Sequence, residues 1–217
     1  MESGSKHRMT EASVFIVSAP SGAGKTSLVR ALLESSPQIT VAVSHTTRLI
    51  RSGERDGVNY HFIEPAAFQR MVAEDAFLEH AQVFDHWYGT SRLAVENEQA
   101  QGRDVILEID WQGARQIRER LPQCASVFIL PPSLETLHSR LTQRGEDEAA
   151  VIERRMRDAV NEISHYAEYE YLVVNDDFGK ALSDLQALVR ARRLRCSVQR
   201  HVLAHTLRSL MAQSSLL

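Results

Sequence analysis

Ten residues near the start of the chain, 18–27, read SAPSGAGKTS and bring glycines, a lysine and hydroxyl side chains close together. They differ from the phosphate-loop pattern G-x-x-x-x-G-K-S/T only at Ala19, where the pattern has its first glycine. In such a loop the backbone N–H groups face the phosphates of a nucleotide, and glycines let the backbone come close. Lys25 would then bind the β- and γ-phosphates, and the Thr26 hydroxyl is a predicted Mg²⁺ ligand.

The segments on either side of this loop favour a phosphate site over a chance match. SVFIVS, residues 13–18, predicts a buried strand, and the spacing of leucine and valine after Thr26 predicts a helix. Alanine fits at position 19 if its φ angle is negative, and Pro20 biases Ala19 toward an extended geometry that meets this condition. The pattern therefore predicts binding of a nucleoside triphosphate. It does not name the reaction, because GTPases, helicases, transport ATPases and kinases share it.

Short apolar runs alternate with helical patterns along most of the chain. SVFIVS, DVILEID, ASVFIL and YLVVN are near-continuous apolar runs, which are typical of parallel strands covered on both faces. The apolar spacing predicts helices over 25–34, 112–120, 134–144 and 181–193. The sequence therefore predicts an α/β fold with a parallel sheet flanked by helices.

Two segments interrupt this alternation. Residues 44–102 have strands in which polar and apolar residues alternate, which predicts a small inserted α+β unit. Within it, FLEHAQVF predicts one face shared by Phe77, Glu79, Ala81 and Val83. Residues 137–165 are helical and rich in arginine, and we interpret them as a mobile lid.

Composition excludes several classes of protein. The chain has 217 residues, 43% of them hydrophobic, and a net charge of −3, which argues against a protein that coats nucleic acid. Two distant cysteines indicate neither a zinc site nor a disulfide framework. The first 13 residues are polar, unlike a signal peptide, and no apolar run is long enough to span a bilayer. We expect a cytoplasmic protein without nucleic-acid or membrane partners.

Two further places have residue types suited to binding a second substrate. The planar guanidinium groups of Arg48 and Arg51 have several N–H donors that suit another phosphate group. The alternative is a solvated charged loop in which Glu54 and Asp56 are the partners of these arginines. Asp110 ends VILEID at the carboxyl edge of a predicted strand, where α/β sheets bind ligands. The alternative for Asp110 is a cap of the helix that follows.

Several motifs together resemble the bacterial guanylate kinases. In chain order they are SAPSGAGKTS, SHTTRLIRSGERDGVNYHF, FLEHAQVFDHWYGTS, LEIDWQGARQI, RGEDEAAVIERRM and SHYAEYEYLVVNDDF, and the resemblance spans about residues 14–188. Members of the family commonly have A-P-S-G or G-P-S-G in the loop, so Ala19 would be a family variant. The resemblance implies a P-loop NTPase core with an inserted α+β GMP-binding subdomain and a helical lid.

The patterns and the resemblance together predict a division of the chain, and the resemblance implies an activity; the polar N-terminal tail and the last ~20 residues lie outside the resemblance. The expected parts are a flexible tail, 1–13; the core, 14–43 and 103–136; the GMP-binding subdomain, 44–102; the lid, 137–165; and further core with C-terminal helices, 166–217. The expected reaction is Mg²⁺-dependent transfer of the γ-phosphoryl group of ATP to GMP or dGMP, for purine nucleotide metabolism and GTP supply. The alternatives are a catalytically inactive guanylate-kinase-like interaction module and a kinase for another nucleotide.

Site residues follow from the resemblance, position by position. The ATP site is expected to comprise Ala19, Pro20, Ser21, Gly22, Ala23, Gly24, Lys25, Thr26, Ser27, Arg144 and Asn175. The GMP phosphate is expected at Arg48, Arg51, Tyr60 and Tyr88, and the guanine at Ser44, Glu79, Thr90 and Asp110. Gly89 is also expected to belong to the GMP site. The groups expected to stabilise the transferred phosphoryl are Lys25, Arg51 and the lid arginines Arg140, Arg144 and Arg155, and the expected Mg²⁺ ligands are Thr26 and Asp110.

Some assignments stay open at the level of sequence. Asp110 is expected to contact guanine, Mg²⁺ or both. Asn175 is expected to border adenine, or to belong to a capping turn before the last long helix. From pattern alone, Glu79 would merely face solvent. The C-terminal segment is predicted to be helical, and it is expected to pack on the core, to join subunits in a homodimer or higher homo-oligomer, or to fray.

Overall fold

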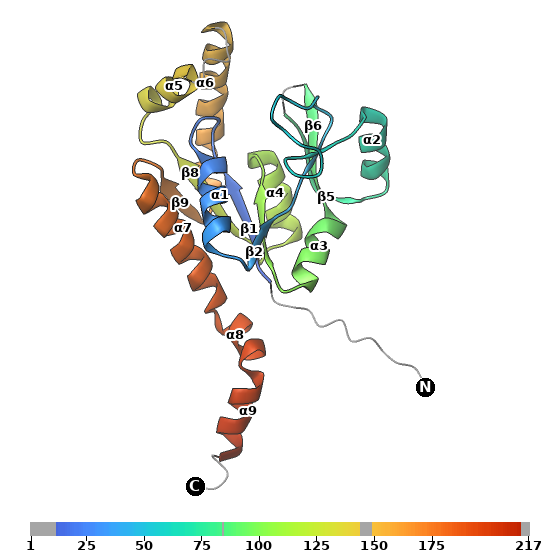
Figure 1. Ribbon diagram of the computed structural model, residues 1–217, viewed down its shortest axis with the longest axis vertical. Coiled ribbons are helices and arrows are strands. Elements are labelled where there is room, and N and C mark those ends of the chain that lie inside the picture. The colour runs from blue at the N-terminus through green and yellow to red at the C-terminus, as the bar shows by residue number, and fades with distance from the viewer. Residues whose placement is uncertain (1–11, 84, 144–148, 214–217) are drawn as a thin grey trace.

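The computed structural model describes residues 12–83, 85–143 and 149–213, and Figure 1 shows its arrangement. Its main sheet has five strands in the order β2-β7-β1-β8-β9, and every neighbouring pair is parallel. The predicted α/β fold with a parallel sheet is confirmed. The strands of this sheet are β1 (Val14–Ser18), β2 (Ile39–Val41), β7 (Asp104–Glu108), β8 (Ala125–Leu130) and β9 (Tyr171–Val174).

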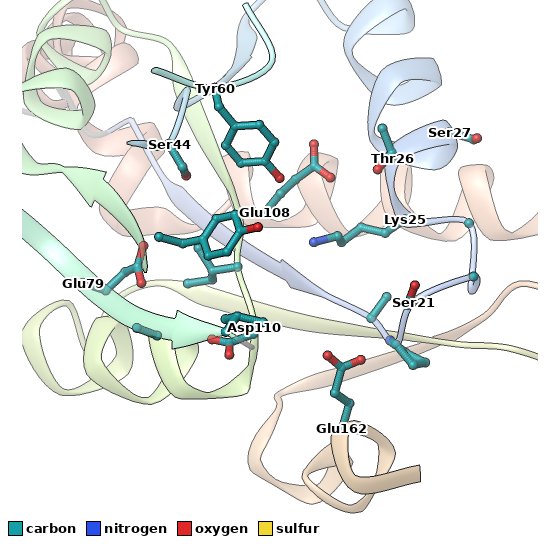
Figure 2. A pocket seen from close by; sticks show the side chains of 18 of the residues that line it. Ser21, Lys25, Thr26, Ser27, Ser44, Tyr60, Glu79, Glu108, Asp110 and Glu162 are labelled. Atoms are coloured by element: carbon teal, nitrogen blue, oxygen red, sulfur yellow. The ribbon is translucent and has the colours of Figure 1, made fainter. Parts of the chain in front are cut away.

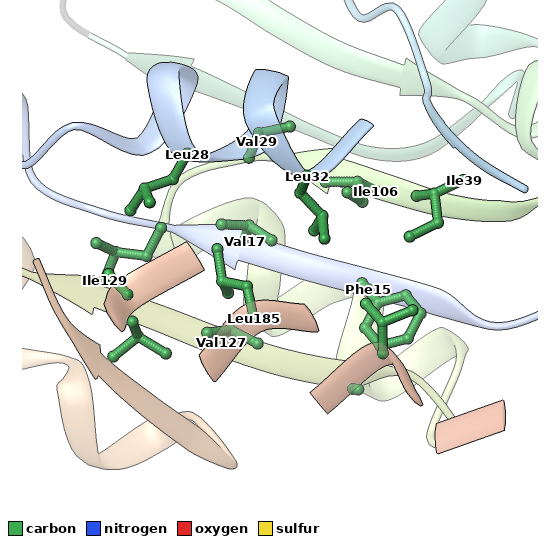
Figure 3. Close-up of a cluster of buried hydrophobic side chains, with 14 of the residues drawn as sticks. Phe15, Val17, Leu28, Val29, Leu32, Ile39, Ile106, Val127, Ile129 and Leu185 are labelled. Carbon is green, nitrogen blue, oxygen red and sulfur yellow. The ribbon is translucent and has the colours of Figure 1, made fainter. Parts of the chain in front are cut away.

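Helices cover both faces of this sheet, which explains the near-continuous apolar strands. Phe15 and Val17 of β1 pack on one face with side chains from α1 and α7, as Figure 3 shows. Val14 and Ile16 point to the other face, where α3 and α4 cover them. The covering helices are α1 (Lys25–Ser35), α3 (Arg92–Ala100), α4 (Trp111–Arg120) and α7 (Phe178–Arg193).

A second, smaller sheet lies in the segment predicted as an α+β insertion. Its order is β4-β3-β6-β5, with one parallel pair and two antiparallel pairs. Phe68 of α2 is fully buried beside this sheet, and its ring stacks on that of Phe77, with ring centroids 4.6 Å apart. The elements are β3 (His45–Thr46), β4 (His61–Phe62), α2 (Pro65–Ala73), β5 (Phe77–Val83) and β6 (His86–Ser91).

A bulge in β5 corrects one prediction. The pairing of β5 with β6 shifts by one residue between Phe77 and Glu79. As a result Phe77 packs toward α2, whereas Glu79 lines a cavity on the opposite side of the sheet. The prediction that Phe77 shares a face with Glu79 is therefore wrong, because an extra residue reverses the alternation at that point.

Two helices of the predicted lid stand on the other side of the phosphate loop from the small sheet, as Figure 1 shows. They are α5 (Leu134–Gln143) and α6 (Ala149–Ser164). They pack on each other through Leu137, Leu141 and Ile152, which form a small buried cluster of their own. The short 3₁₀ helix η1 (Tyr166–Glu168) then leads from α6 toward β9.

Two helices, α8 (Cys196–Val202) and α9 (Ala204–Gln213), end the described part of the chain. Figure 1 shows them extending from the end of α7 away from the sheet. Leu207 and Leu210 of α9 remain 40% and 58% exposed, so this segment is helical, as predicted, but does not pack on the core. No described helix is both long enough and apolar enough to cross a membrane.

Candidate active site

The phosphate loop has a backbone that only glycine adopts easily. Gly24 has a φ of 91° and stands immediately before α1. A Cβ there would lie 2.4 Å from Nδ2 of Asn175, so both the backbone angle and the available space require glycine. Of the described residues other than glycine, Asp75 alone has a positive φ, so the φ of Ala19 is negative. This confirms the expectation that alanine fits at position 19 with a negative φ.

Asn175 holds this loop in place through a hydrogen bond to its backbone. Its Nδ2 donates a buried hydrogen bond to the carbonyl oxygen of Ala23 (2.7 Å), and its own carbonyl oxygen accepts one from Nη2 of Arg140 (3.1 Å). Asp177 caps α7 by accepting from the N–H of Lys180 (2.7 Å), so the predicted capping turn is present.

Asn175 also borders a cavity of about 400 Å³ on this side of the loop. The residues that line it are Gly22, Gly24, Ser27, Arg140, Gln143, Asn175, Asp176 and Phe178.

A second cavity, of about 360 Å³, joins the phosphate loop to the small sheet. Figure 2 shows Lys25 extending from the start of α1 toward Glu108 and Tyr60, with Glu79 and Asp110 on the far side. Loop residues and predicted acceptor residues therefore share one space. The lining residues are Ala19, Pro20, Ser21, Gly22, Gly24, Lys25, Thr26, Ser27, Ser44, Arg51, Tyr60, Glu79, Ala81, Val83, Tyr88, Glu108, Ile109, Asp110 and Glu162.

A cluster of polar side chains around the buried Glu79 forms one end of this cavity. The Glu79 side chain is only 3% exposed, and its Oε1 accepts a hydrogen bond from the Thr90 hydroxyl (2.6 Å). The hydroxyls of Ser44 and Thr90 are 3.3 Å apart. Burial raises the pKa of Glu79 to about 7; the Thr90 hydrogen bond opposes this rise, and the charge of Asp110 adds to it.

Asp110 has one of the two roles that the sequence left open at this edge of the sheet, that of a helix cap. Its Oδ1 accepts from the N–H of Gly113 (2.9 Å), so Asp110 caps α4. Its Oδ2 accepts from the side-chain amide of Gln112 (3.1 Å). Asp110 also lines the cavity, where it is available to a ligand.

The two predicted phosphate-binding arginines differ in their surroundings. Both Nη atoms of Arg48 bind the carboxylate of Glu54, at 2.9 and 2.8 Å, and Arg48 does not line the cavity. Of the alternative reading, a solvated loop with Glu54 and Asp56 as partners, the pairing with Glu54 is present, but Arg48 is buried rather than solvated. Arg51 is exposed and lines the cavity. No acidic side chain in the described part of the chain forms an ion pair with its guanidinium.

Two tyrosines complete the wall beside Arg51. The rings of Tyr60 and Tyr88 meet edge to face with centroids 5.8 Å apart, and both line the cavity. The Arg48 guanidinium lies 5.4 Å from the Tyr60 ring centroid, so it supports the tyrosine from outside the cavity. Burial raises the pKa of Tyr60 to about 12, which keeps its hydroxyl a donor at neutral pH.

The remaining predicted site residues lie elsewhere. Gly89 and Thr90 are buried behind the cavity wall, where Gly89 faces the rings of Phe77 and Phe68. Arg140 lines the cavity next to Asn175, whereas Arg155 is half-buried on α6 and lines neither cavity. Arg144 lies outside the described residues.

Comparisons with known proteins agree with this geometry. A model of the family described as "Guanylate kinase" matches residues 11–192. The chain is 62% identical to a guanylate kinase of Alkalilimnicola ehrlichii over 91% of this chain and 98% of the relative. It is 55% identical to one of Hahella chejuensis, over 95% of this chain and all of the relative. The chain belongs to the guanylate kinase family.

A solved structure supports the same conclusion at the level of the fold. The crystal structure of guanylate kinase from Anaplasma phagocytophilum superposes with a TM-score of 0.72 at 31% sequence identity. The match covers 89% of this chain and 94% of that one. The guanylate kinase fold therefore extends over almost the whole described chain.

Sequence reasoning missed two acidic residues of this guanylate kinase site. Glu108 follows the apolar stretch of β7, and Glu162 belongs to α6; both line the cavity. Figure 2 shows Glu162 pointing toward Ser21 of the phosphate loop. Burial raises the pKa of Glu162 to about 7, against the opposing effect of Lys25. Its Oε2 is buried without a hydrogen-bond partner in the part of the chain that the structure describes.

The residues present fit the Mg²⁺ ion that guanylate kinases use. The hydroxyl of Thr26 and the carboxylate of Asp110 line the same cavity as Lys25. The described residues contain no group of three or more histidine, cysteine, aspartate or glutamate side chains that would hold a metal alone. Mg²⁺ is usually bound by one or two protein oxygens, water and substrate phosphates, so a sparse protein site of this kind suits it.

Removing the Asn175 side chain should loosen the phosphate loop. Asn175→Ala leaves the buried carbonyl of Ala23 unpaired, so we expect the free energy of unfolding to fall by about 1–3 kcal/mol and the KM for ATP to rise. Asn97→Ala, on the exposed surface of α3, is the matched control. Denaturant titration and steady-state kinetics measure both effects. An unchanged KM for ATP would contradict the supporting role.

Proposed function

We propose that this chain catalyses ATP + GMP → ADP + GDP through the cavity shared by its phosphate loop and small sheet. One observation supports the proposal most directly. Lys25 and Thr26 of the loop line the same cavity as Arg51, Tyr60 and Glu79, so a donor and an acceptor nucleotide would meet there. An inactive interaction module would not need this set of chemical groups in one space.

The donor triphosphate binds along the loop. The N–H groups of the loop stand at the positive end of α1, and Lys25 reaches the β- and γ-phosphates. The cavity beside Asn175 and Phe178 receives the adenine. When bound, Mg²⁺ supplies positive charge to the phosphate oxygens, with Thr26 and Asp110 as its protein ligands.

The acceptor phosphate binds opposite the loop. Arg51, Tyr60 and Tyr88 hold it, while Arg48 stays paired with Glu54 and fixes the Tyr60 ring. An oxygen of the GMP phosphate attacks the γ-phosphorus, and the bond from that phosphorus to the leaving oxygen of ADP breaks. The second pKa of a phosphate monoester is about 6, so the nucleophile is already ionised at neutral pH and no general base is needed.

Base selection rests on the buried carboxylate. Guanine presents its N1–H and 2-amino group as adjacent donors, and both oxygens of Glu79 are able to accept from them. Adenine has an acceptor at N1 and no 2-amino group, so it would leave the carboxylate unpaired. An unpaired buried polar group costs about 1–3 kcal/mol, and a charged group costs more, which is enough to discriminate between bases.

Arginines of the predicted lid neutralise the transferred phosphoryl group. Arg140 is already held at the loop through the carbonyl of Asn175. Arg155 lies on α6, which also carries Glu162 to the cavity. Closure of these helices over two bound nucleotides would bring further positive charge to the γ-phosphate and exclude water.

Binding of GMP should strengthen as the pH rises toward 7. The pKa of Glu79 in the free protein is raised to about 7, and guanine needs the ionised carboxylate, so binding below this pH must release a proton. Calorimetric titrations at pH 6, 7 and 8 in two buffers measure affinity and proton release. The phosphate of GMP also titrates, so Glu79→Gln is the control and should lose most of the dependence between pH 6 and 8. The same pH profile in both proteins would contradict this role.

A panel of acceptors tests the proposed function. ADP formation is followed with ATP and each of GMP, dGMP, AMP, CMP, UMP and dTMP, and with no acceptor. We expect rapid turnover with GMP, turnover with dGMP, and little with the others. Equal rates for all nucleotides would refute guanine selection, and no stimulation by GMP would favour the interaction module. The cytoplasm is the proposed location, and a homodimer or a higher homo-oligomer is the proposed assembly.

A further inference from the structure

Gly113 lies between the carboxylate of Glu79, which we assign to guanine, and that of Asp110. It is buried in the first turn of α4, and its N–H donates to Oδ1 of Asp110 (2.9 Å). A Cβ at this position would lie 2.5 Å from Oε2 of Glu79 and 3.1 Å from its Cδ. The Glu79 carboxylate therefore fills the space that any side chain at position 113 would occupy.

The strand that carries Glu79 is fixed to the same helix on both sides of this contact. The side-chain amide of Gln116 donates to the carbonyl oxygen of His80 (2.8 Å) and accepts from its N–H (3.2 Å). Arg120 donates to the carbonyl oxygen of Phe77 (2.9 Å). Because the backbone of β5 is held to α4 in this way, a methyl group at position 113 would move the carboxylate rather than the strand.

The position of the carboxylate is set by two contacts. The Thr90 hydroxyl holds Oε1, and Oε2 lies against Gly113. The positive end of α4 favours negative charge at this place, where Asp110 is also located. If the carboxylate rotated away from Gly113, it would lose this position at the positive end of α4.

We propose that Gly113 is a specificity-determining residue for the acceptor base. Its lack of a side chain lets the Glu79 carboxylate lie against the first turn of α4, facing the N1–H and the 2-amino group of guanine. This inference rests on the guanine-binding role proposed for Glu79. The inference adds Gly113 to the residues that select the base, although Gly113 contacts neither phosphate and has no side-chain functional group.

Gly113→Ala tests the inference. We expect the KM for GMP to rise roughly 10- to 100-fold through the loss of hydrogen bonds to a charged group, while the KM for ATP stays near its original value. The preference for GMP over inosine monophosphate, which lacks the 2-amino group, should shrink. Gly179→Ala is the matched control, because Gly179 also lies in the first turn of a helix. A Cβ at position 179 would lie 3.4 Å from its nearest atom, Oδ1 of Asp177, which is an ordinary van der Waals contact.

A double-mutant cycle with Glu79→Ala separates the possible outcomes. If Gly113 acts through Glu79, adding Gly113→Ala to Glu79→Ala changes the KM for GMP no further. If Glu79→Ala alone leaves GMP kinetics intact, the proposed role of Glu79 is wrong and the inference fails with it. If Glu79→Ala raises the KM for GMP but Gly113→Ala does not, only the inference is wrong.

The cycle also covers the case in which Gly113→Ala does not fold. In the Glu79→Ala background the new methyl group meets no carboxylate, so we expect the double variant to unfold at the same denaturant concentration as Glu79→Ala. A double variant that is as unstable as Gly113→Ala would mean that position 113 serves packing alone, and the inference would be overturned.

Discussion

Replacing Glu79 by glutamine should lower kcat/KM for GMP by roughly 10²- to 10⁴-fold, because two hydrogen bonds to a charged group contribute about 1.5–3 kcal/mol each. Glutamine keeps the size of the side chain, but it presents an amide N–H₂ group to the donors of guanine. The Kd of ATP should change little, since Glu79 lies at the end of the cavity away from the loop. Steady-state kinetics and calorimetry measure the two quantities.

Glu74→Gln is the control for this variant, because Glu74 lies on the exposed end of α2 in the same part of the chain. It should leave both nucleotides unaffected. Equal losses for GMP and ATP in Glu79→Gln would point to a general disturbance of the fold and would contradict guanine recognition by Glu79.

Replacing Lys25 by methionine should lower kcat by roughly 10²- to 10³-fold, the usual loss when one group that stabilises transition-state charge is removed. Lys25 extends into the cavity toward the place where the γ-phosphate would be transferred. Methionine retains most of the length of the side chain without its charge, so the fold should persist. A coupled assay of ADP formation gives kcat, and circular dichroism checks the fold.

Lys180 offers a matched substitution. It is exposed on α7 and lines neither cavity, so Lys180→Met should leave kcat unchanged. Retention of more than a tenth of the original kcat in Lys25→Met would show that Lys25 does not provide the charge required by the mechanism.

Local patterns in the sequence were enough to predict the phosphate loop and the main sheet. The glycines, Lys25 and the strand and helix around them are neighbours in the chain, so their spacing alone determines their arrangement. The cap at Asp110 is equally local, since its partner Gly113 is three residues away. Parallel strands were recognisable because both of their faces are apolar.

Features that depend on distant contacts were not predictable in this way. The bulge that turns Phe77 away from Glu79 depends on pairing with β6. Glu162 is one charged residue among several on α6, and only the packing of that helix beside the loop brings it to Ser21. The sequence suggested Glu54 as a partner for an arginine in a solvated loop, but it did not show that Arg48 would be buried when it forms this pair.

The fate of the γ-phosphoryl group tests the central claim most directly, namely that donor and acceptor phosphates face each other across one cavity. ATP labelled in its γ-phosphate is mixed with GMP and the protein, and the products are separated after less than one turnover. We predict that the label appears in the β-phosphate of GDP, at the same rate as ADP forms. Label in inorganic phosphate or on the protein itself would contradict direct transfer between two facing nucleotides.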